Sequence, residues 1–371
     1  MQTRSIALAA GLLVNLAVAG AAAESSLKDA YQGDFVVGAA LNEPEITGQD
    51  AAGDAIIAAQ FSSISPENCL KWERVHPEPN RYDFALPDQY VALGEKNHMF
   101  IVGHNLVWHN QVPDRVFHDA NGKLLGRKAL LARLKHHIYT VVGRYKGRIN
   151  AWDVVNEVVD EDGSLRKSPW LKIIGPGYIA MAFRYAHQAD SKAELLYNDY
   201  NLEIPKKREG AIALVKQLIK QRVPITTVGL QGHYLLGEPS VEQVDTAISE
   251  FAKLGMKVAI TELDVDVLPR PAGGPTADVT LNIAQNSALN PYVGGLPDSV
   301  QQQLAARYGE LFAVFVKHRD VIDRVTLWGV TDADTWHNNW PIRGRTAYSL
   351  LFDRAGQPKP AFDAAIHAAG R

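Results

Sequence analysis

The chain alternates short apolar runs with amphipathic patterns of helical period eight times, and this alternation limits the possible folds more than any other feature. Strands that alternate with helices pair in parallel, and eight such units close into a barrel. The sequence therefore predicts an α/β protein with a (β/α)8 TIM barrel. The apolar runs cover residues 35–41, 61–66, 99–108, 149–157, 194–201, 227–234, 257–265 and 325–331, and helical patterns cover, among others, 127–145, 207–221, 241–254 and 298–318.

Residues 1–23 have the pattern of a signal peptide. A basic start at Arg4 is followed by an apolar stretch over residues 6–18 and by three alanines ahead of Glu24. A transmembrane anchor is the alternative, but the apolar stretch is short for a bilayer span. No linker interrupts residues 24–371. We therefore expect a single domain that is secreted or periplasmic, monomeric, and not attached to a membrane after cleavage.

Charge and cysteine content exclude several classes of function. Removing residues 1–23 takes away Arg4, the only charged residue there, and moves the formal net charge from −3 to −4. Nucleic acid partners require clustered Lys and Arg, whereas the basic clusters over 144–148 and 206–208 are short and are expected at solvated helix ends. Cys69 is the only cysteine, which excludes an intrachain disulfide and thiolate metal sites. A neutral polymer is the easier partner, and no nucleic acid is expected.

Two of the apolar runs deliver a carboxylate near their C-terminal end. The run over residues 149–157 stops on Asn156 and Glu157, and the run over 257–265 contains Glu262 close to its end. In a parallel barrel the C-terminal ends of all strands share one face, so two acids far apart in the sequence can line one cleft. Glu157 alone could instead be a solvated acid at a helix N-terminus. As a pair, the two acids suit the cleavage of a glycosidic bond.

Polar and aromatic side chains follow the other runs as well. At the C-terminal face of a barrel such groups indicate catalysis or binding, and a long connection over residues 268–296 would lie at the same face. A lone histidine or tryptophan is more often a packing residue, but an indole also stacks on the apolar face of a pyranose. The side chains concerned include Glu67, Asn68, His104, His109, Asn198, Asp199, Gln231, His233, Asp264 and Asp332, and the tryptophans 72, 108, 328, 336 and 340.

Other chemistries leave no convincing signature in the sequence. Residues 175–180 match the dinucleotide fingerprint GxGxxA, but Pro176 is awkward there and nucleotide binding needs an open sheet. No GxSxG, HExxH or P-loop motif occurs. A metal-dependent barrel hydrolase is the remaining option, but no His-x-His ends the first run. We expect neither a metal nor any other cofactor.

Taken together, the motifs resemble those of glycoside hydrolase family 10, whose members are mainly endo-β-1,4-xylanases. The resemblance spans the chain after residue 23 in the right order, and Cys69 and Asn105 depart from the more usual residues only at positions without a chemical role. The matching segments are ENCLKW from Glu67, GHNLVWH from Gly103, WDVVNE from Trp152, LYNDYN from Leu196, LQGHY from Leu230, ITELD from Ile260 and LWGVTDADTW from Leu327, which leads into NWP at 339–341.

The resemblance implies an endo-1,4-β-xylanase that acts on xylan and xylo-oligosaccharides with retention of anomeric configuration. It implies Glu157 as the acid/base and Glu262 as the nucleophile. It also implies a set of sugar contacts. These are Glu67, Asn68 and Lys71 for the sugar two units from the cleavage point, His104, Trp108, Asn156, Gln231 and His233 around the reacting sugar, and Trp328 and Trp336 as its aromatic walls.

The mechanism requires one carboxyl to be protonated while the other is ionised, although both start from a pKa of about 4.3. We expect His233, steadied by Asp264, and Asn156 to favour the carboxylate of Glu262, which leaves Glu157 protonated. Gln111 and Trp336 could fill the space that the hydroxymethyl group of glucose needs. Two rivals stay open. One is a related barrel glycosidase that acts on cellulose or mannan, and the other is a polysaccharide-binding protein that has lost turnover.

Overall fold

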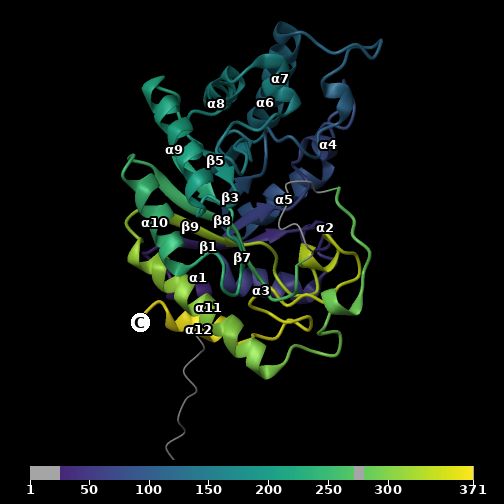
Figure 1. The fold of residues 1–371 in the computed structure, drawn as a ribbon. Helices are drawn as coiled ribbons and strands as arrows, with labels where there is room; N and C mark the ends of the chain where they lie inside the picture. The colour runs from purple at the N-terminus through teal and green to yellow at the C-terminus, as the bar shows by residue number, and fades with distance from the viewer. Residues whose placement is uncertain (1–25, 271–279, 371) are drawn as a thin grey trace, which may run out of the picture.

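The computed structural model describes residues 26–270 and 280–370 (Figure 1). The predicted signal peptide and part of the expected connection over residues 268–296 therefore lie outside the described residues. No helix in the described ranges is long and apolar enough to cross a membrane.

Eight parallel strands form a closed barrel at the centre of the molecule (Figure 1). Strand β6 pairs with both β5 and β8, which closes the ring, and the short strand β7 pairs with the far end of β8. The barrel predicted from the sequence is confirmed. Its strands are β1 (Val36–Leu41), β2 (Ser63–Pro66), β3 (Phe100–Gly103), β4 (Ala151–Asn156), β5 (Glu194–Asp199), β6 (Thr227–Leu230), β8 (Lys257–Asp266) and β9 (Ile322–Leu327), and β7 covers His233–Leu235.

Helices surround the barrel (Figure 1) and cover the outer face of its strands, which explains why the strands are apolar along most of their length. The main helices are α3 (Ala51–Gln60), α5 (Ala85–Lys96), α6 (Arg127–Arg144), α8 (Gly177–Ala189), α9 (Pro205–Lys220), α10 (Val241–Ala252), α11 (Asp298–Lys317) and α12 (Pro360–His367). Shorter ones are α1 (Leu27–Ala30), α2 (Glu43–Ile46), α4 (Trp72–Val75) and α7 (Pro169–Ile174), with 3₁₀ turns at Asp114–Val116, Ser287–Leu289 and Trp336–Asn338.

Helix α10 illustrates how local sequence sets these elements. The side chain of Ser240 accepts a hydrogen bond from the backbone N–H of Gln243, and the Gln243 side chain accepts one from the backbone of Ser240. This reciprocal pair is a capping box, which fixes the start of the helix. Val244, Ile248 and Phe251 then bury one face at helical spacing. The helix therefore begins one residue after its cap, where the apolar pattern predicts it.

The strands end earlier than expected at three places around the cleft. Strand β3 stops at Gly103 instead of residue 108, and Val107 forms only an isolated bridge to Val155. The run over 227–234 is divided into β6 and β7 because Gly232 takes a positive φ of 87° between them. The last strand covers Ile322–Leu327 rather than 325–331. In each case the backbone leaves the ladder where its side chains enter the cleft.

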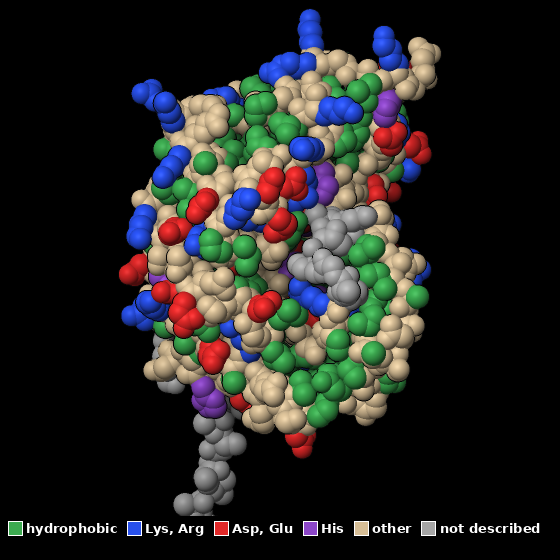
Figure 2. All heavy atoms as spheres, viewed as in Figure 1, with side chains coloured by type: hydrophobic (Ala, Val, Ile, Leu, Met, Phe, Trp, Pro, Cys, Tyr) green, Lys and Arg blue, Asp and Glu red, His purple; other side chains and the backbone are tan. Residues whose placement is uncertain are grey.

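Basic and acidic side chains lie interspersed over the left-hand part of the face shown in Figure 2. The cluster over 144–148 lies at a solvated helix end, as predicted. There Arg144 pairs with Asp88, and Arg148 Nη2 lies 2.7 Å from Glu95 Oε2. The cluster over 206–208 also lies at a helix end, but its residues Lys207 and Arg208 are buried near the active site.

Candidate active site

A cleft of about 860 Å³ opens at the C-terminal ends of the barrel strands. The structure brings together in its lining both predicted catalytic acids and all eleven predicted sugar contacts. These are Glu67, Asn68, Lys71, His104, Trp108, Gln111, Asn156, Glu157, Gln231, His233, Glu262, Trp328 and Trp336. The tryptophan at position 340, which the sequence also singled out, lies in the lining too. Other lining residues were not singled out from the sequence, among them Glu73, Asn110, Tyr200, Asn201, Asp266, Arg270, Ile283, His337 and Arg345.

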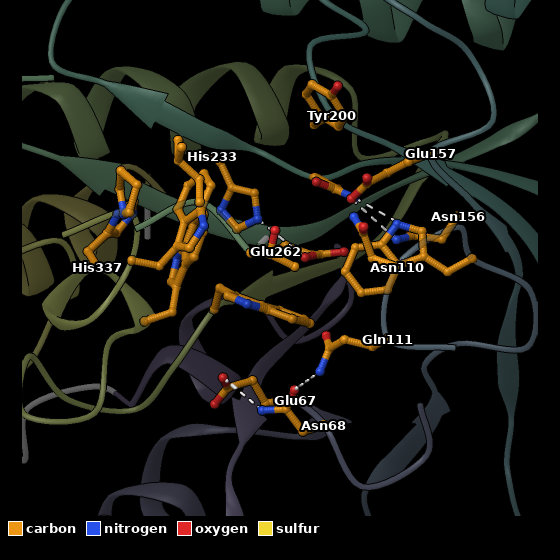
Figure 3. A pocket seen from close by; sticks show the side chains of 18 of the residues that line it. Glu67, Asn68, Asn110, Gln111, Asn156, Glu157, Tyr200, His233, Glu262 and His337 are labelled. Carbon is orange, nitrogen blue, oxygen red and sulfur yellow. Dashed lines mark hydrogen bonds and ion pairs between the residues drawn. The ribbon is translucent and has the colours of Figure 1, made fainter. Parts of the chain in front are cut away.

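Glu262 lies at the centre of the cleft as drawn in Figure 3, with Glu157 and Tyr200 toward one end and Glu67 and Asn68 toward the other. The cleft therefore continues on both sides of the two acids. A polymer that binds along it would have units on either side of the cleavage point.

Glu262 is a buried carboxylate near the end of β8. Its Oε1 accepts a hydrogen bond from Asn198 Nδ2 at 2.7 Å, and its Oε2 lies 3.3 Å from His233 Nε2. Burial alone would raise the pKa of Glu262, but the hydrogen bond from His233, the charges of His104 and His233, and the hydrogen bond from Asn198 hold this pKa below its ordinary value. The structure thus favours the ionised form of Glu262.

His233 is held by the acid that the sequence predicted. Its Nδ1 lies 3.1 Å from Oδ2 of the fully buried Asp264, which also accepts a hydrogen bond from Trp336 Nε1 at 2.7 Å. Burial would lower the pKa of His233, but the charges and hydrogen bonds of Asp264 and Glu262 raise it to about 10. The imidazolium therefore carries a proton on each nitrogen at neutral pH. One nitrogen faces Asp264 and the other faces Glu262. His337, which the sequence analysis missed, places its Nε2 3.1 Å from the other oxygen of Asp264.

The prediction that Asn156 donates to Glu262 is wrong, and Asn198 is the donor instead. Asn156 Nδ2 lies 3.4 Å from Glu157 Oε1, and its Oδ1 accepts from Asn198 at 2.9 Å and from Gln231 at 3.4 Å. The two asparagines lie directly opposite each other on β4 and β5. Thr261 Oγ1 donates to Asn198 Oδ1 at 2.6 Å, so the amide is oriented with its Nδ2 toward Glu262.

Replacing Asn198 by alanine should move the acidic limb of the pH profile of kcat/KM to higher pH and lower its maximum about tenfold. The hydrogen bond from Asn198 favours the carboxylate of Glu262, so its loss raises the pKa of Glu262, and a smaller fraction is ionised at low pH. The alkaline limb serves as the internal control, since the Asn198 side chain makes no hydrogen bond to Glu157. An unchanged acidic limb would contradict this role of Asn198.

Glu157 directly follows β4, and its pKa is shifted in the opposite direction from that of Glu262. Burial raises its pKa, and the charge of Asp199 and, to a smaller extent, that of Glu262 raise it further, while the side chains of Trp108 and Gln231 lower it. Gln231 Nε2 donates to Oε1 at 3.2 Å, and the buried Oε2 has no hydrogen-bond partner among the described residues. A protonated Glu157 therefore keeps one oxygen available to a substrate atom.

The backbone of Glu157 is held in the left-handed region, with φ of 56°. Arg166 Nε donates to the carbonyl of Glu157 at 2.7 Å, and the backbone N–H of Glu157 donates to the carbonyl of Asn198 at 2.8 Å. Gln111 and Asn201, which also line the cleft, have positive φ values of 46° and 54°. Such conformations are costly for residues other than glycine and persist where the surroundings enforce them, often at functional sites.

Two of the three basic residues over 206–208, Lys207 and Arg208, are buried beside this segment, contrary to the prediction that the cluster is solvated, whereas Lys206 is exposed. The Lys207 side chain is fully buried, and its Nζ lies 3.0 Å from Oδ1 of the fully buried Asp199 and 3.2 Å from the ring centroid of Tyr200. Arg208 Nε lies 2.7 Å from Glu250 Oε2. Helix α9 begins at Pro205, so its first turn faces the end of β5, where Asp199 lies, whereas Glu250 belongs to helix α10.

Replacing Lys207 by methionine should destabilise the fold by about 3 kcal/mol, because it leaves the buried charge of Asp199 without its partner. The matched control is Lys206→Met, since Lys206 is the exposed neighbour on the same turn. Urea unfolding of the two variants and the wild type measures the difference. Equal stability of the two variants would contradict the importance of the buried pair.

At the other end of the cleft, Asn68 connects three predicted sugar contacts. Its Nδ2 donates to Glu67 Oε1 at 3.0 Å, and its Oδ1 accepts from Lys71 Nζ at 3.0 Å and from Gln111 Nε2 at 3.3 Å. Burial lowers the pKa of Lys71, although the charge of Glu67 opposes this effect. The ammonium lies 5.1 Å from the ring centroid of Trp108. These groups form a rigid polar surface of donors and acceptors, which suits sugar hydroxyls.

The tryptophans divide into cleft and packing residues. Trp336 and Trp340 stack with centroids 4.8 Å apart, and Trp328 meets the rings of His104 and His233 edge-on at 5.3 and 6.2 Å. All three tryptophans line the cleft. The tryptophan at position 72 is instead buried in a stack with histidine rings, so it is a packing residue, which was the alternative considered for each tryptophan.

Comparisons with known proteins agree with this geometry. The model of the family described as glycosyl hydrolase family 10 matches residues 26–368. The chain is 43% identical to endo-1,4-beta-xylanase A of Xylanibacter ruminicola over 94% of this chain and 95% of that protein, and 39% identical to an endo-1,4-beta-xylanase of Geobacillus stearothermophilus over 91% and 96%. Among solved structures, a GH10 endoxylanase retrieved from a sugarcane soil metagenome is similar with a TM-score of 0.90 and 47% identity, over 92% of this chain and 99% of that one.

Proposed function

The chain belongs to glycosyl hydrolase family 10, and we propose that it is an endo-1,4-β-xylanase that hydrolyses internal bonds of xylan by double displacement, with retention of anomeric configuration. The observation that carries the proposal is the opposed state of two buried acids in one cleft, with the pKa of Glu157 raised and that of Glu262 lowered. A retaining glycosidase needs one acid protonated and the other ionised at the same pH.

In the first step the carboxylate of Glu262 attacks the anomeric carbon, and Glu157 donates its proton to the oxygen of the departing sugar. The bond to the leaving group breaks as the ester to Glu262 forms. His233 and Asn198 contact the two oxygens of Glu262 and keep the carboxylate ionised until the attack. Glu157 offers its buried Oε2, which has no other partner among the described residues.

In the second step water cleaves the ester. Once Glu262 is esterified its negative charge is gone, so one of the effects that raise the pKa of Glu157 disappears. Glu157 is then the base that takes a proton from the incoming water. Activity is thus lost below the pKa of Glu262, where the nucleophile is protonated, and above the pKa of Glu157, where the acid is ionised.

The linkage between the two acids supports coordinated roles. Three amide side chains connect them: Gln231 contacts Glu157 and Asn156, and Asn198 contacts Asn156 and Glu262. Each amide has its orientation fixed by its neighbours, so the acids are held on rigid strand ends. Pre-organised groups of this kind lower the cost of reaching the transition state.

Preference for xylose is proposed to rest on bulky side chains that line the cleft. Trp336 is fixed by its hydrogen bond to Asp264, and Gln111 is fixed by Asn68 and by Glu73 Oε1 at 3.1 Å. Neither side chain can move away freely to admit a hydroxymethyl group. Xylan, which lacks that group, is the substrate that fits such a cleft.

The product profile on unbranched xylan, carboxymethyl cellulose and mannan tests the proposed function, with the Glu262→Ala protein as control. We expect short β-linked xylo-oligosaccharides from xylan alone, and none from the variant. Cleavage of cellulose or mannan without cleavage of xylan would overturn the substrate. Binding of xylan without cleavage would favour the rival of a binding protein that has lost turnover.

We also propose that the mature enzyme acts outside the cytoplasm and begins at Glu24, on the basis of the basic, apolar and small-residue pattern of residues 1–23. N-terminal sequencing of the protein from the periplasm or culture medium tests this. A protein that keeps Met1 in the cytoplasm would contradict it.

A further inference from the structure

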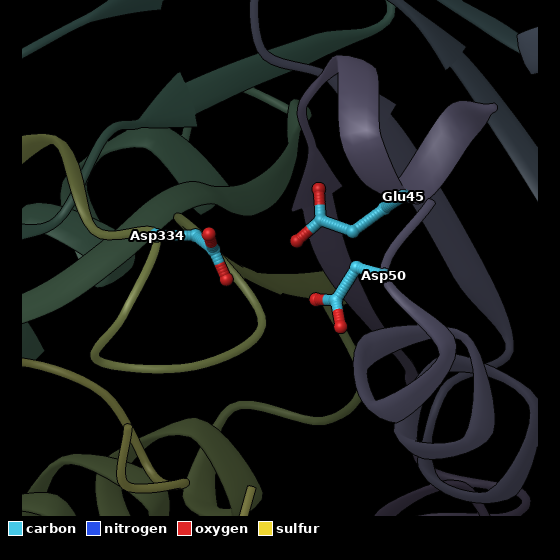
Figure 4. A group of neighbouring side chains, drawn as sticks. All are labelled: Glu45, Asp50 and Asp334. Atoms are coloured by element: carbon cyan, nitrogen blue, oxygen red, sulfur yellow. The ribbon is translucent and has the colours of Figure 1, made fainter. Parts of the chain in front are cut away.

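Three carboxylates meet outside the residues that line the cleft, and they come from three segments (Figure 4). Glu45 belongs to the short helix α2 after β1, Asp50 precedes helix α3, and Asp334 lies in the loop after β9. One oxygen from each residue lies within 4.8 Å of the other two. We refer to these three residues as the loop acid cluster.

Glu45 is the member whose environment is incomplete. It is 1% exposed, its Oε2 accepts a hydrogen bond from the backbone N–H of Asn42 at 2.6 Å, and its buried Oε1 has no hydrogen-bond partner among the described residues. A buried carboxylate oxygen without a partner is costly, and native proteins rarely contain one. Figure 4 shows one Glu45 oxygen directed toward Asp334. The Glu45 carboxylate therefore faces negative charge where a positive group is needed.

Each of the other two acids has one oxygen held by the protein. Asp50 Oδ1 accepts from the backbone N–H of Gly53 at 3.0 Å, and Asp334 Oδ2 accepts from Thr331 Oγ1 at 3.0 Å. Both side chains are partly exposed, so solvent can reach the cluster. Three anchored carboxylates that converge from different segments are the arrangement that a hard cation with oxygen ligands requires.

We propose that the loop acid cluster is a binding site for a divalent cation of the size of Ca²⁺, held by Glu45, Asp50 and Asp334. Ca²⁺ binds oxygen at about 2.3–2.6 Å, so two of its ligands can lie up to about 5 Å apart, whereas Mg²⁺ at about 2.0–2.1 Å accepts no more than about 4.2 Å. The three ligand oxygens lie within 4.8 Å of one another, so they are close enough together to share one ion of this size. Water completes the coordination on the exposed side.

The electrostatic surroundings of Glu45 favour a nearby cation. Burial raises the pKa of Glu45 to about 8, the backbone N–H of Asn42 lowers it, and the charges of Asp334, Glu67 and Asp50 raise it. All of the charged groups among these are acids. The charges that face this buried carboxylate therefore favour a cation beside it.

The position of the cluster gives the ion a structural role. Strands β1 and β9 are neighbours in the barrel and come from opposite ends of the chain, and the ion joins the loops that follow them. Asp334 is two residues from Trp336, which lines the cleft. The ion would tie down the loop that carries this tryptophan without entering the catalytic steps. This site departs from the expectation that the chain holds no metal.

Calorimetric titration of EDTA-treated, dialysed enzyme with CaCl2 at pH 8, together with thermal unfolding, tests the proposal. We expect binding of about one ion per chain and a rise in Tm of about 3 °C or more at saturation. Asp334→Asn should weaken binding at least tenfold, and Asp50→Asn, which keeps the oxygen that caps α3, should do the same. Asp320→Asn, an exposed acid elsewhere on the surface, is the matched control and should bind as the wild type does.

Absence of both binding heat and a Tm shift in the wild type would overturn the proposal. So would equal affinity in the wild type and in both cluster variants, since the ion would then bind elsewhere. Binding of MgCl2 as tightly as CaCl2 would contradict the assignment to a large cation. Because neither variant touches the cleft, turnover of the variants shows that they are folded.

Discussion

Replacing Glu262 by alanine should lower kcat on xylan by about 10⁵-fold, which is the largest effect expected of any single substitution in this chain. The variant lacks the atom that forms the bond to the anomeric carbon, and no other ionised carboxylate takes its position between His233 and Asn198. Steady-state kinetics on xylan and on an aryl β-xylobioside measure the loss. A smaller loss on the aryl substrate is not expected, since both substrates need the nucleophile.

Added azide separates loss of the nucleophile from loss of folding. In the Glu262→Ala protein, azide can enter the space left by the carboxylate and displace an activated leaving group, and the product should be the α-glycosyl azide. Retained binding of xylotriose and an unfolding temperature near that of the wild type are the controls. Substantial turnover without azide would remove Glu262 as the nucleophile.

Replacing Glu157 by alanine should lower kcat/KM on xylan by about 10³-fold, whereas an aryl xyloside with an acidic phenol should lose little in the first step. A sugar leaving group needs the proton of Glu157, and a dinitrophenolate does not. The alkaline limb of the pH profile should also disappear, because the wild type loses activity when Glu157 is ionised. A pH series of kcat/KM on both substrates measures these effects.

The stereochemistry of azide rescue distinguishes the two acids. In the Glu157→Ala protein Glu262 still forms the ester, and azide attacks it from the side where water would, so the product should be the β-glycosyl azide. The two variants should therefore give opposite anomers. Equal losses on xylan and on the activated substrate, or an α product, would contradict the acid/base role of Glu157.

The barrel and the positions of the reacting groups could be predicted because both depend on short-range patterns. Each strand is a brief apolar run, and the parallel barrel places every strand end at one face. It follows that Glu157, Gln231 and Glu262 share a cleft, whatever the details of packing. The exact ends of the strands were harder to predict. At residue 103, for example, the backbone stops pairing with the neighbouring strands where the following side chains enter the cleft.

The pairing of His233 with Asp264 and Glu262 was predicted, but the partners of several other polar side chains were not, because they depend on orientation in three dimensions. Asn156 and Asn198 both end neighbouring strands, and only the hydrogen bond from Thr261 shows which amide faces Glu262. Lys207 belongs to a basic run that was predicted to be solvated, yet the first turn of α9 places it against Asp199. His337 was missed for the same reason, since no motif in the sequence indicates that it reaches Asp264.

The conformation of Glu157 was also beyond the reach of sequence patterns. Its positive φ is enforced by Arg166, which lies nine residues further along in a loop without a recognisable pattern. The loop acid cluster is a comparable case, because Glu45 and Asp334 lie near opposite ends of the chain. Contacts of this kind become visible only when β1 and β9 are paired.

Trapping the covalent intermediate tests the central claim most directly. A 2-deoxy-2-fluoro-xylobioside with a dinitrophenyl leaving group should glycosylate the wild-type enzyme faster than the resulting ester is hydrolysed, because fluorine slows both steps whereas the good leaving group makes the first step fast again. Mass spectrometry of the digested protein should then find one disaccharide attached to the peptide that contains Glu262, and none in Glu262→Ala. Attachment to any other residue, or turnover to an α product without an adduct, would contradict double displacement through Glu262.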